Sequence, residues 1–202
     1  MFRHYFPTLA DGSLREALKT TALAFLILTV IGFAAVYLFP EAAELLVSFF
    51  NDKVESLGME KLSGMEAAAT LFFNNLLASF SAVADGAIPF LYLSAAALGT
   101  NALLIGAFGA MYQQSGLGLW AYLVGILPHG IFELPALIIA CTLGLSLCKV
   151  GTARLLRREV RCGFLLHLRD CSRFFFVFVL PLLLLAALVE VYLTPVLLSL
   201  VL

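Results

Sequence analysis

The sequence predicts an all-α membrane protein, a polytopic bundle of about five transmembrane helices. Hydrophobic residues make up 62% of the 202 positions, charged residues make up 12%, and the mean hydropathy is +1.04. Charges are nearly absent from the long apolar runs and gather between them, which is typical of a chain that spans lipid. We expect residues 1–202 to form a single membrane domain.

The first expected span covers 20–39, which is long enough to cross a hydrocarbon core of about 30 Å. It is interpreted as a retained helix because it is long and ends at Pro40, with no short apolar core followed by a small-residue cleavage site. After Pro40, Leu and Phe alternate with acidic residues at roughly helical spacing. This pattern predicts an interfacial amphipathic helix after span one.

A weakly polar tract over 66–113 is too long for one crossing and must fold back. The expected hinge is Asp85-Gly86-Ala87-Ile88-Pro89, since glycine permits turn dihedrals and proline interrupts helices. Spans two and three are therefore predicted at about 67–84 and 89–112.

The fourth span is predicted at 117–147 and the fifth at 174–200. Pro128-His129-Gly130 predicts a broken helix within span four, and Pro135 is a further helix-breaking position. Such a break should face protein or a wet cavity. A re-entrant 117–128 would move the following basic stretch to the outside, against the charge rule, so five crossings are preferred.

Charge predicts the orientation. Ten of the 12 Lys and Arg residues lie before span one or within 149–173, whereas 40–66 holds two lysines against six acidic residues. By the positive-inside rule the N-terminus and 149–173 are cytoplasmic, and five crossings place the C-terminus outside. This rule explains the basic stretch without nucleic acid, which we do not expect as a partner. Cys141 and Cys148 are interpreted as packing residues, with no disulfide framework.

Polar residues within the spans are few, and each needs a partner. Asn74, Asn75, Asn101 and His129 all fall near mid-membrane and could form one buried layer. The asparagines either hydrogen-bond between helices or line a pathway for an ion or small solute.

Three acidic residues of the spans and turns remain. Glu133 follows His129 by one helical turn, so the two form either an internal pair or a metal, proton or catalytic site. If a metal binds anywhere, these two residues are its ligand candidates. Asp85 is interpreted as a turn residue, and Glu190 either reaches the outer interface or pairs within the bundle. HExxH and a serine or cysteine triad are absent, so we expect no cofactor, no catalytic residues and no enzymatic activity.

Three motifs carry a family resemblance. In order, they are Phe72-Phe73-Asn74-Asn75, Gly99-Thr100-Asn101-Ala102-Leu103-Leu104-Ile105-Gly106-Ala107 and Leu127-Pro128-His129-Gly130-Ile131-Phe132-Glu133-Leu134-Pro135-Ala136. Over about 66–150 the chain resembles the stage II sporulation protein M family, departing from it at Ala102, where glycine is expected. The resemblance implies a polytopic membrane protein without established enzyme activity. The family's namesake holds cell-wall-degrading partners at the septal membrane during engulfment, a role that does not transfer to relatives from organisms that do not sporulate.

Two hypotheses of function follow. The first is a non-enzymatic scaffold in the cytoplasmic membrane, a homo-oligomer and most simply a dimer, which positions membrane or cell-wall-remodelling proteins. Small residues in span three permit close helix contact in such an assembly: Ala95, Ala96, Ala97 and Gly99. The alternative is a transporter or channel component whose path follows the asparagines, His129 and Glu133. A membrane-embedded metalloenzyme is a third hypothesis.

Overall fold

The computed structural model describes residues 5–10, 12–41, 62–159 and 162–200. Throughout this part of the chain the regular structure is helical, and five helices are long and apolar enough to cross a membrane. The elements are α2 Ser13–Leu38, α4 Gly64–Ala84, η2 Asp85–Ala87, α5 Leu93–Gln114, α6 Gly118–Leu155, α7 Phe164–Phe174, the π-helical turn η3 Phe175–Val179, α8 Leu180–Tyr192 and α9 Thr194–Leu198. The predicted fold class is confirmed. The interfacial helix expected after span one falls on residues 42–61, which lie outside the described residues.

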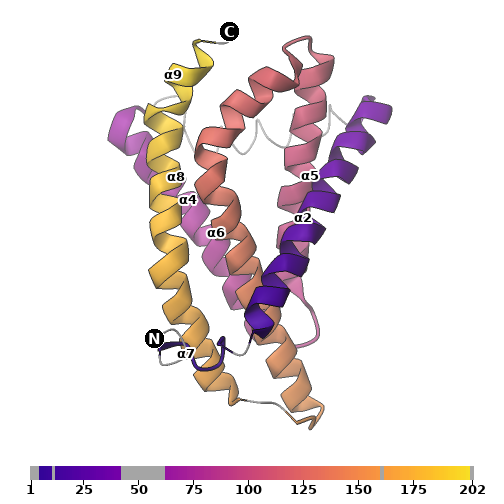
Figure 1. Ribbon diagram of the computed structural model, residues 1–202, viewed down its shortest axis with the longest axis vertical. Coiled ribbons are helices and arrows are strands. Elements are labelled where there is room, and N and C mark those ends of the chain that lie inside the picture. Colours follow the sequence, from indigo (N-terminus) through magenta and orange to yellow (C-terminus); the bar gives the residue numbers. More distant parts are fainter. Residues whose placement is uncertain (1–4, 11, 42–61, 160–161, 201–202) are drawn as a thin grey trace.

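Helix α6 is the centre of the bundle, since α2, α4, α5 and α8 all contact it. Figure 1 shows the N-terminus, the α4–α5 turn and α7 toward one end of the molecule, and the C-terminus and the α5–α6 turn at the other. This arrangement agrees with five successive crossings. The end that holds the N-terminus and α7 is the one that the charge count predicts to be cytoplasmic.

The predicted fold-back at Asp85 is confirmed, and it is longer than expected. After η2, the Ile88 amide donates to the Asp85 carbonyl at 3.1 Å, and Phe90 and Tyr92 take positive φ angles of 68° and 47°. These residues form the turn, so α5 begins at Leu93 and not at 89. The Phe90 amide also donates to Oγ1 of Thr152 at 2.8 Å, which fixes the turn against α6.

Glycines bring backbones into direct contact at two seams. A Cβ built on Gly86 would overlap the backbone of Gly144 in α6, and one on Gly32 in α2 would overlap the backbone of Leu103 in α5. Beside the first seam, Ser94 Oγ donates to the Ala82 carbonyl at 2.7 Å. Both seams exclude any side chain larger than hydrogen at the glycine.

The predicted break in span four is wrong. Helix α6 runs without interruption from Gly118 to Leu155, with Pro128 and Pro135 inside it and Gly130 buried. Each proline lacks the N–H that would bond four residues back, which loosens the helix, and Figure 1 shows α6 bending in its upper part. The continuous helix also excludes a re-entrant 117–128.

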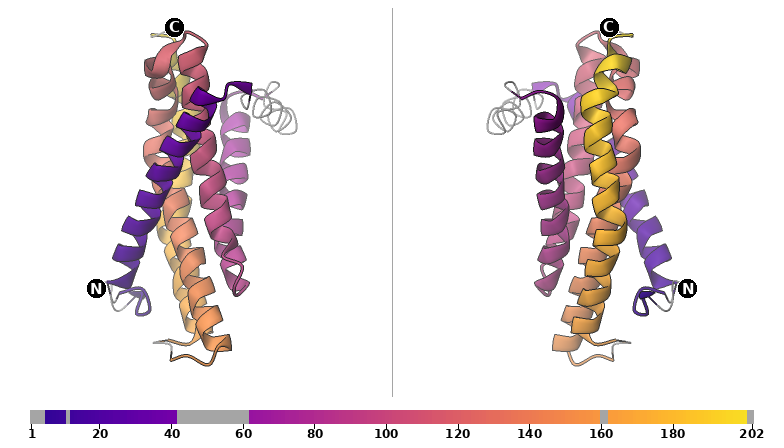
Figure 2. Two further views of the ribbon diagram at one scale, coloured as in Figure 1. Left: turned by 90° about the vertical axis from the view of Figure 1, so that its right-hand side faces the viewer. Right: turned by 90° about the vertical axis from the view of Figure 1, so that its left-hand side faces the viewer.

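The fifth span begins earlier than predicted, at Phe164 and not at 174. Helix α7 is amphipathic: its buried face holds His167, Asp170 and Cys171, while Arg169 and Arg173 point outward. The charges that suggested a loop therefore lie on one side of a helix. The π-helical turn η3 then leads into α8, and Pro181 explains it, because a proline cannot continue the regular ladder to residue 177. Figure 2 shows α6 and α7 reaching beyond the α4–α5 turn.

The segment before α2 packs against this extension. The side chains of Phe6 and Leu9, with Leu14 of the first turn of α2, are buried in one cluster with Cys171, Phe174 and Phe175. The rings of Phe6 and Phe174 meet edge to face, with centroids 5.3 Å apart. The N-terminal segment is thus part of the core at that end of the bundle.

Candidate functional site

Three ionisable side chains lie together between α6 and the last span: His129, Glu133 and Glu190. The sequence predicted the first two as neighbours and Glu190 separately. One ring nitrogen of His129 and one carboxylate oxygen each of Glu133 and Glu190 lie within 4.8 Å of one another. All three side chains are half-buried. Of the two positions left open for Glu190, the structure shows the one inside the bundle.

Helical periodicity explains why these residues meet. On α6, His129 and Glu133 are one helical turn apart. The next positions on the same side of the helix, Ala136 and Leu137, are buried. On α8, Glu190 continues the buried stripe of Leu183, Ala186 and Ala187 at spacings of seven, four and three residues. The apolar faces that pack α6 against α8 therefore place the three polar side chains at one interface, the seam between α6 and the last span.

A hydroxyl group orients the imidazole. Thr194 Oγ1 lies 3.4 Å from Nδ1 of His129 and donates its own hydrogen to the Val189 carbonyl at 3.3 Å. If the hydroxyl hydrogen goes to Val189, the hydroxyl accepts from the ring, and the proton of neutral His129 is then on Nδ1, with the lone pair on Nε2.

The helices that build the site carry no Lys or Arg along most of their length. The chain has no Lys or Arg at 62–148 or 174–202, the ranges that include most of α6 and all of α8. At about 1.5 Å per residue, His129 lies about 16 Å along α6 from its start at Gly118, within the expected hydrocarbon depth. Carboxyl groups at such a depth are expected to be paired, protonated or bound to a cation.

The predicted asparagine layer is wrong. Asn101 lies exposed on the outer side of α5, where its Nδ2 donates to the Ala97 carbonyl of the same helix at 2.9 Å. Asn74 and Asn75 bond to each other at 3.2 Å on α4, and Asn74 lines a shallow surface hollow with Thr70 and Phe73. The prediction rested on depth along the membrane normal, and depth does not determine which way a helix faces.

Asp85 and the other predicted helix-breaking positions have structural roles. Asp85 is half-buried at the start of η2, and Gly86 and Pro89 lie in the α4–α5 turn as predicted. All four cysteines are free thiols, and Cys141, Cys148 and Cys171 are buried, in agreement with the packing role expected of the first two.

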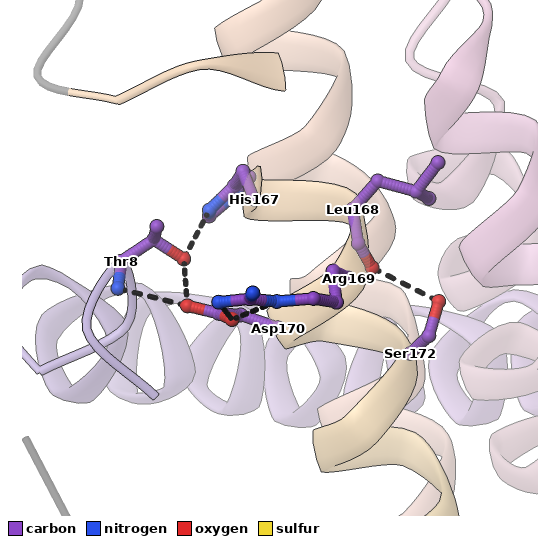
Figure 3. Close-up of polar contacts among 6 residues, drawn as sticks. All are labelled: Thr8, His167, Leu168, Arg169, Asp170 and Ser172. Carbon is purple, nitrogen blue, oxygen red and sulfur yellow. Dashed lines mark hydrogen bonds and ion pairs between the residues drawn. The ribbon is translucent and has the colours of Figure 1, made fainter. Parts of the chain in front are cut away.

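A second polar cluster, which was not predicted from the sequence, lies at the opposite end of the interface between α6 and the last span. Figure 3 shows its contacts. The Asp170 carboxylate is completely buried, and its Oδ2 accepts from the backbone amide of Thr8 at 3.0 Å and from the Thr8 hydroxyl at 2.9 Å. Its Oδ1 accepts from Arg169 at 3.2 Å. The only sequence signal was an Asp on the apolar side of an amphipathic helix, and nothing in the N-terminal sequence marked Thr8 as its partner.

His167 extends this network to α6. Its Nδ1 lies 3.0 Å from the Thr8 hydroxyl and its Nε2 lies 3.0 Å from Ser146 Oγ. Since the Thr8 hydroxyl donates to Asp170, Nδ1 must be the donor to Thr8. The network therefore joins the N-terminal segment, α7 and α6 through side chains that satisfy one another.

The fold defines the class of protein: an integral membrane protein with several spans around one central helix, α6. The stage II sporulation protein M family matches residues 21–195, and the chain belongs to that family. The match extends the resemblance, which rested on about 66–150, to nearly the whole described bundle. No curated protein and no solved structure matches the chain.

Proposed function

We propose that this protein is a non-enzymatic scaffold in the cytoplasmic membrane, assembled from at least two copies, that positions partner proteins of envelope or cell-wall remodelling. Membership of the stage II sporulation protein M family supports the proposal. So does the tight glycine packing of α2 on α5 and of the α4–α5 turn on α6, which suits a rigid frame.

The observation that carries the proposal is the outward position of Asn101. Asn101 is exposed about one third of the way along α5, so in a bilayer its amide would face hydrocarbon. The bond to Ala97 uses one of its two amide hydrogens. Ala97, one turn before Asn101 on the same side of α5, is small and only half-buried, and a small residue allows a second helix to approach closely. A helix of another chain on this face would complete the amide's hydrogen bonds.

Crosslinking in native membranes tests the proposal. We expect wild-type protein to be captured as a dimer or higher oligomer together with partner proteins, and Asn101→Leu to reduce both products severalfold. Thr100→Val is the matched control: it keeps the shape of the neighbouring exposed side chain, and the Thr100 hydroxyl already donates to the Ala96 carbonyl. Equal crosslinking of Asn101→Leu and wild type, or normal envelope assembly in a deletion strain, would contradict the scaffold.

The second candidate is movement of an ion or small solute, which the His129, Glu133 and Glu190 cluster favours over a purely structural role. Flux into proteoliposomes, compared with His129→Ala and Glu133→Gln, tests it. Flux equal to that of empty vesicles would exclude transport. Metal-dependent turnover that chelation abolishes would instead support the metalloenzyme alternative.

A further inference from the structure

We propose that His129, Glu133 and Glu190 form a binding site for one divalent transition-metal cation of the Zn²⁺ or Mn²⁺ class. The proposal goes beyond the scaffold function and does not depend on it. It assigns a ligand to a cluster that the sequence suggested only in part, since Glu190 is 57 residues away from Glu133 along the chain.

Donor chemistry supports this class of cation. One imidazole nitrogen and two carboxylate oxygens suit Zn²⁺, Mn²⁺ or Fe²⁺, whereas Mg²⁺ and Ca²⁺ prefer oxygen ligands throughout. Three protein ligands around Zn²⁺ leave a fourth position for water or a further ligand. Two carboxylates and a neutral imidazole would together offset the two charges of the cation.

Geometry allows the site to close on a metal. Bonds of about 2.1 Å in a tetrahedral arrangement separate ligand atoms by about 3.4 Å. The three ligand atoms now lie within 4.8 Å, so each pair needs to approach by at most about 1.4 Å. Rotation of the flexible glutamate side chains supplies such a movement without moving α6 or α8.

The surroundings of His129 fit a metal ligand. Metal-bound imidazoles usually donate the proton of their other nitrogen to a fixed acceptor, which sets the tautomer. Thr194 Oγ1 is in place as that acceptor, at 3.4 Å from Nδ1, and is itself fixed by its bond to the Val189 carbonyl. When Nδ1 donates to this oxygen, Nε2 is the nitrogen left for the cation.

A divalent cation bound here would join α6 to α8, since His129 and Glu133 come from one helix and Glu190 from the other. Protonation of the glutamates is the competing explanation, and it predicts no metal binding.

Metal binding by the purified full-length chain tests the proposal. The protein carries Cys162→Ser, because Cys162 is the one thiol of the four that is not buried and could bind Zn²⁺ adventitiously. After chelation and removal of the chelator, calorimetry with Zn²⁺ and elemental analysis should both give one Zn²⁺ per chain. Substituted Co²⁺ should show no thiolate charge-transfer band.

Isosteric variants identify the ligands. Glu190→Gln and Glu133→Gln should each weaken Zn²⁺ binding by more than about 100-fold, and Thr194→Val by about 10-fold to 100-fold, since outer-shell partners typically contribute that much. Glu66→Gln, at the exposed start of α4, is the matched control and should bind like the parent.

Three results would overturn the proposal. The first is the absence of stoichiometric Zn²⁺ or Mn²⁺ binding by the parent protein, which needs no variant to fold. The second is unchanged affinity in Glu190→Gln that elutes as the parent does. The third is binding of Mg²⁺ or Ca²⁺ in preference to Zn²⁺ and Mn²⁺, which would exclude the transition-metal class.

Discussion

The two polar clusters lie at opposite ends of the seam between α6 and the last span, and they differ in how their charges are satisfied. Around Asp170, the buried carboxylate accepts bonds from Thr8 and Arg169, and His167 connects the same threonine to Ser146. Around Glu190, two carboxylates share their space with one imidazole on helices without basic residues. In the Asp170 cluster each printed contact joins a donor to an acceptor, whereas the Glu190 cluster brings two carboxyl groups together with one imidazole.

The difference suggests different roles for similar residues. Buried polar groups that are fully paired hold a structure in place, and removing one partner leaves the others unsatisfied. A group of like charges in an apolar seam is costly for the fold and is expected where a ligand or proton compensates it. Three substitutions and the addition of Zn²⁺ test this difference between the clusters, from the largest expected effect to the smallest.

Asp170→Ala should destabilise the protein most, by about 3 kcal/mol, because it removes a fully buried acceptor and leaves both half-buried donors of Thr8 without it. Denaturant unfolding in detergent measures the loss. Asp170→Asn should cost less, since an amide oxygen still accepts one bond. Glu16→Gln is the control, because it alters only an exposed ion pair with Lys19. The proposed difference between the two clusters is wrong if Asp170→Ala is as stable as this control.

Zn²⁺ should stabilise the wild-type protein by about 2.7 kcal/mol at a concentration one hundred times its dissociation constant. The reason is that folding brings together the ligands on α6 and α8, which the unfolded chain keeps apart. A thermal shift with and without chelator measures this effect. Glu190→Gln should show no such shift, and an equal shift in this variant would place the ion elsewhere.

Ser146→Ala should destabilise by about 1 kcal/mol, the typical net contribution of one hydrogen bond, since His167 loses its partner on α6. Amide hydrogen exchange should rise in residues 5–10 as the network loosens. Unchanged exchange there would show that the apolar contacts of Phe6 hold the segment alone.

Glu190→Gln without metal should have the smallest effect, and of the opposite sign. Glutamine keeps the shape of Glu190 and removes any repulsion between the two carboxyl groups, so the free energy of unfolding at neutral pH should stay equal or rise by up to about 1 kcal/mol. Unfolding in the presence of chelator measures it. A loss of stability instead would mean that the Glu190 cluster is as complete as the Asp170 cluster.

The sequence allowed five spans, the Asp85 fold-back and the closeness of His129 to Glu133 to be predicted, because each depends on local hydropathy or helical periodicity. It did not allow the direction of Asn101 to be predicted, since hydropathy reports depth and not the side of a helix that faces a neighbour. Glu190 and Glu133, like Thr8 and Asp170, are far apart in the sequence. Their contacts depend on tertiary packing, which local sequence patterns do not reveal. Proline at 128 suggested a break because local propensity favours one, but tertiary packing preserves the helix.

The glycine seams have a consequence for how sequences of this fold can diverge. Outward faces need only remain apolar, so Leu, Ile, Val and Phe can replace one another there at little cost. At Gly32, Gly86, Gly106 and Gly144 even one methyl group would overlap a neighbouring backbone. We expect these four positions to be the most intolerant in a saturation screen, and to be the last trace of common ancestry among relatives whose lipid-facing surfaces have drifted apart.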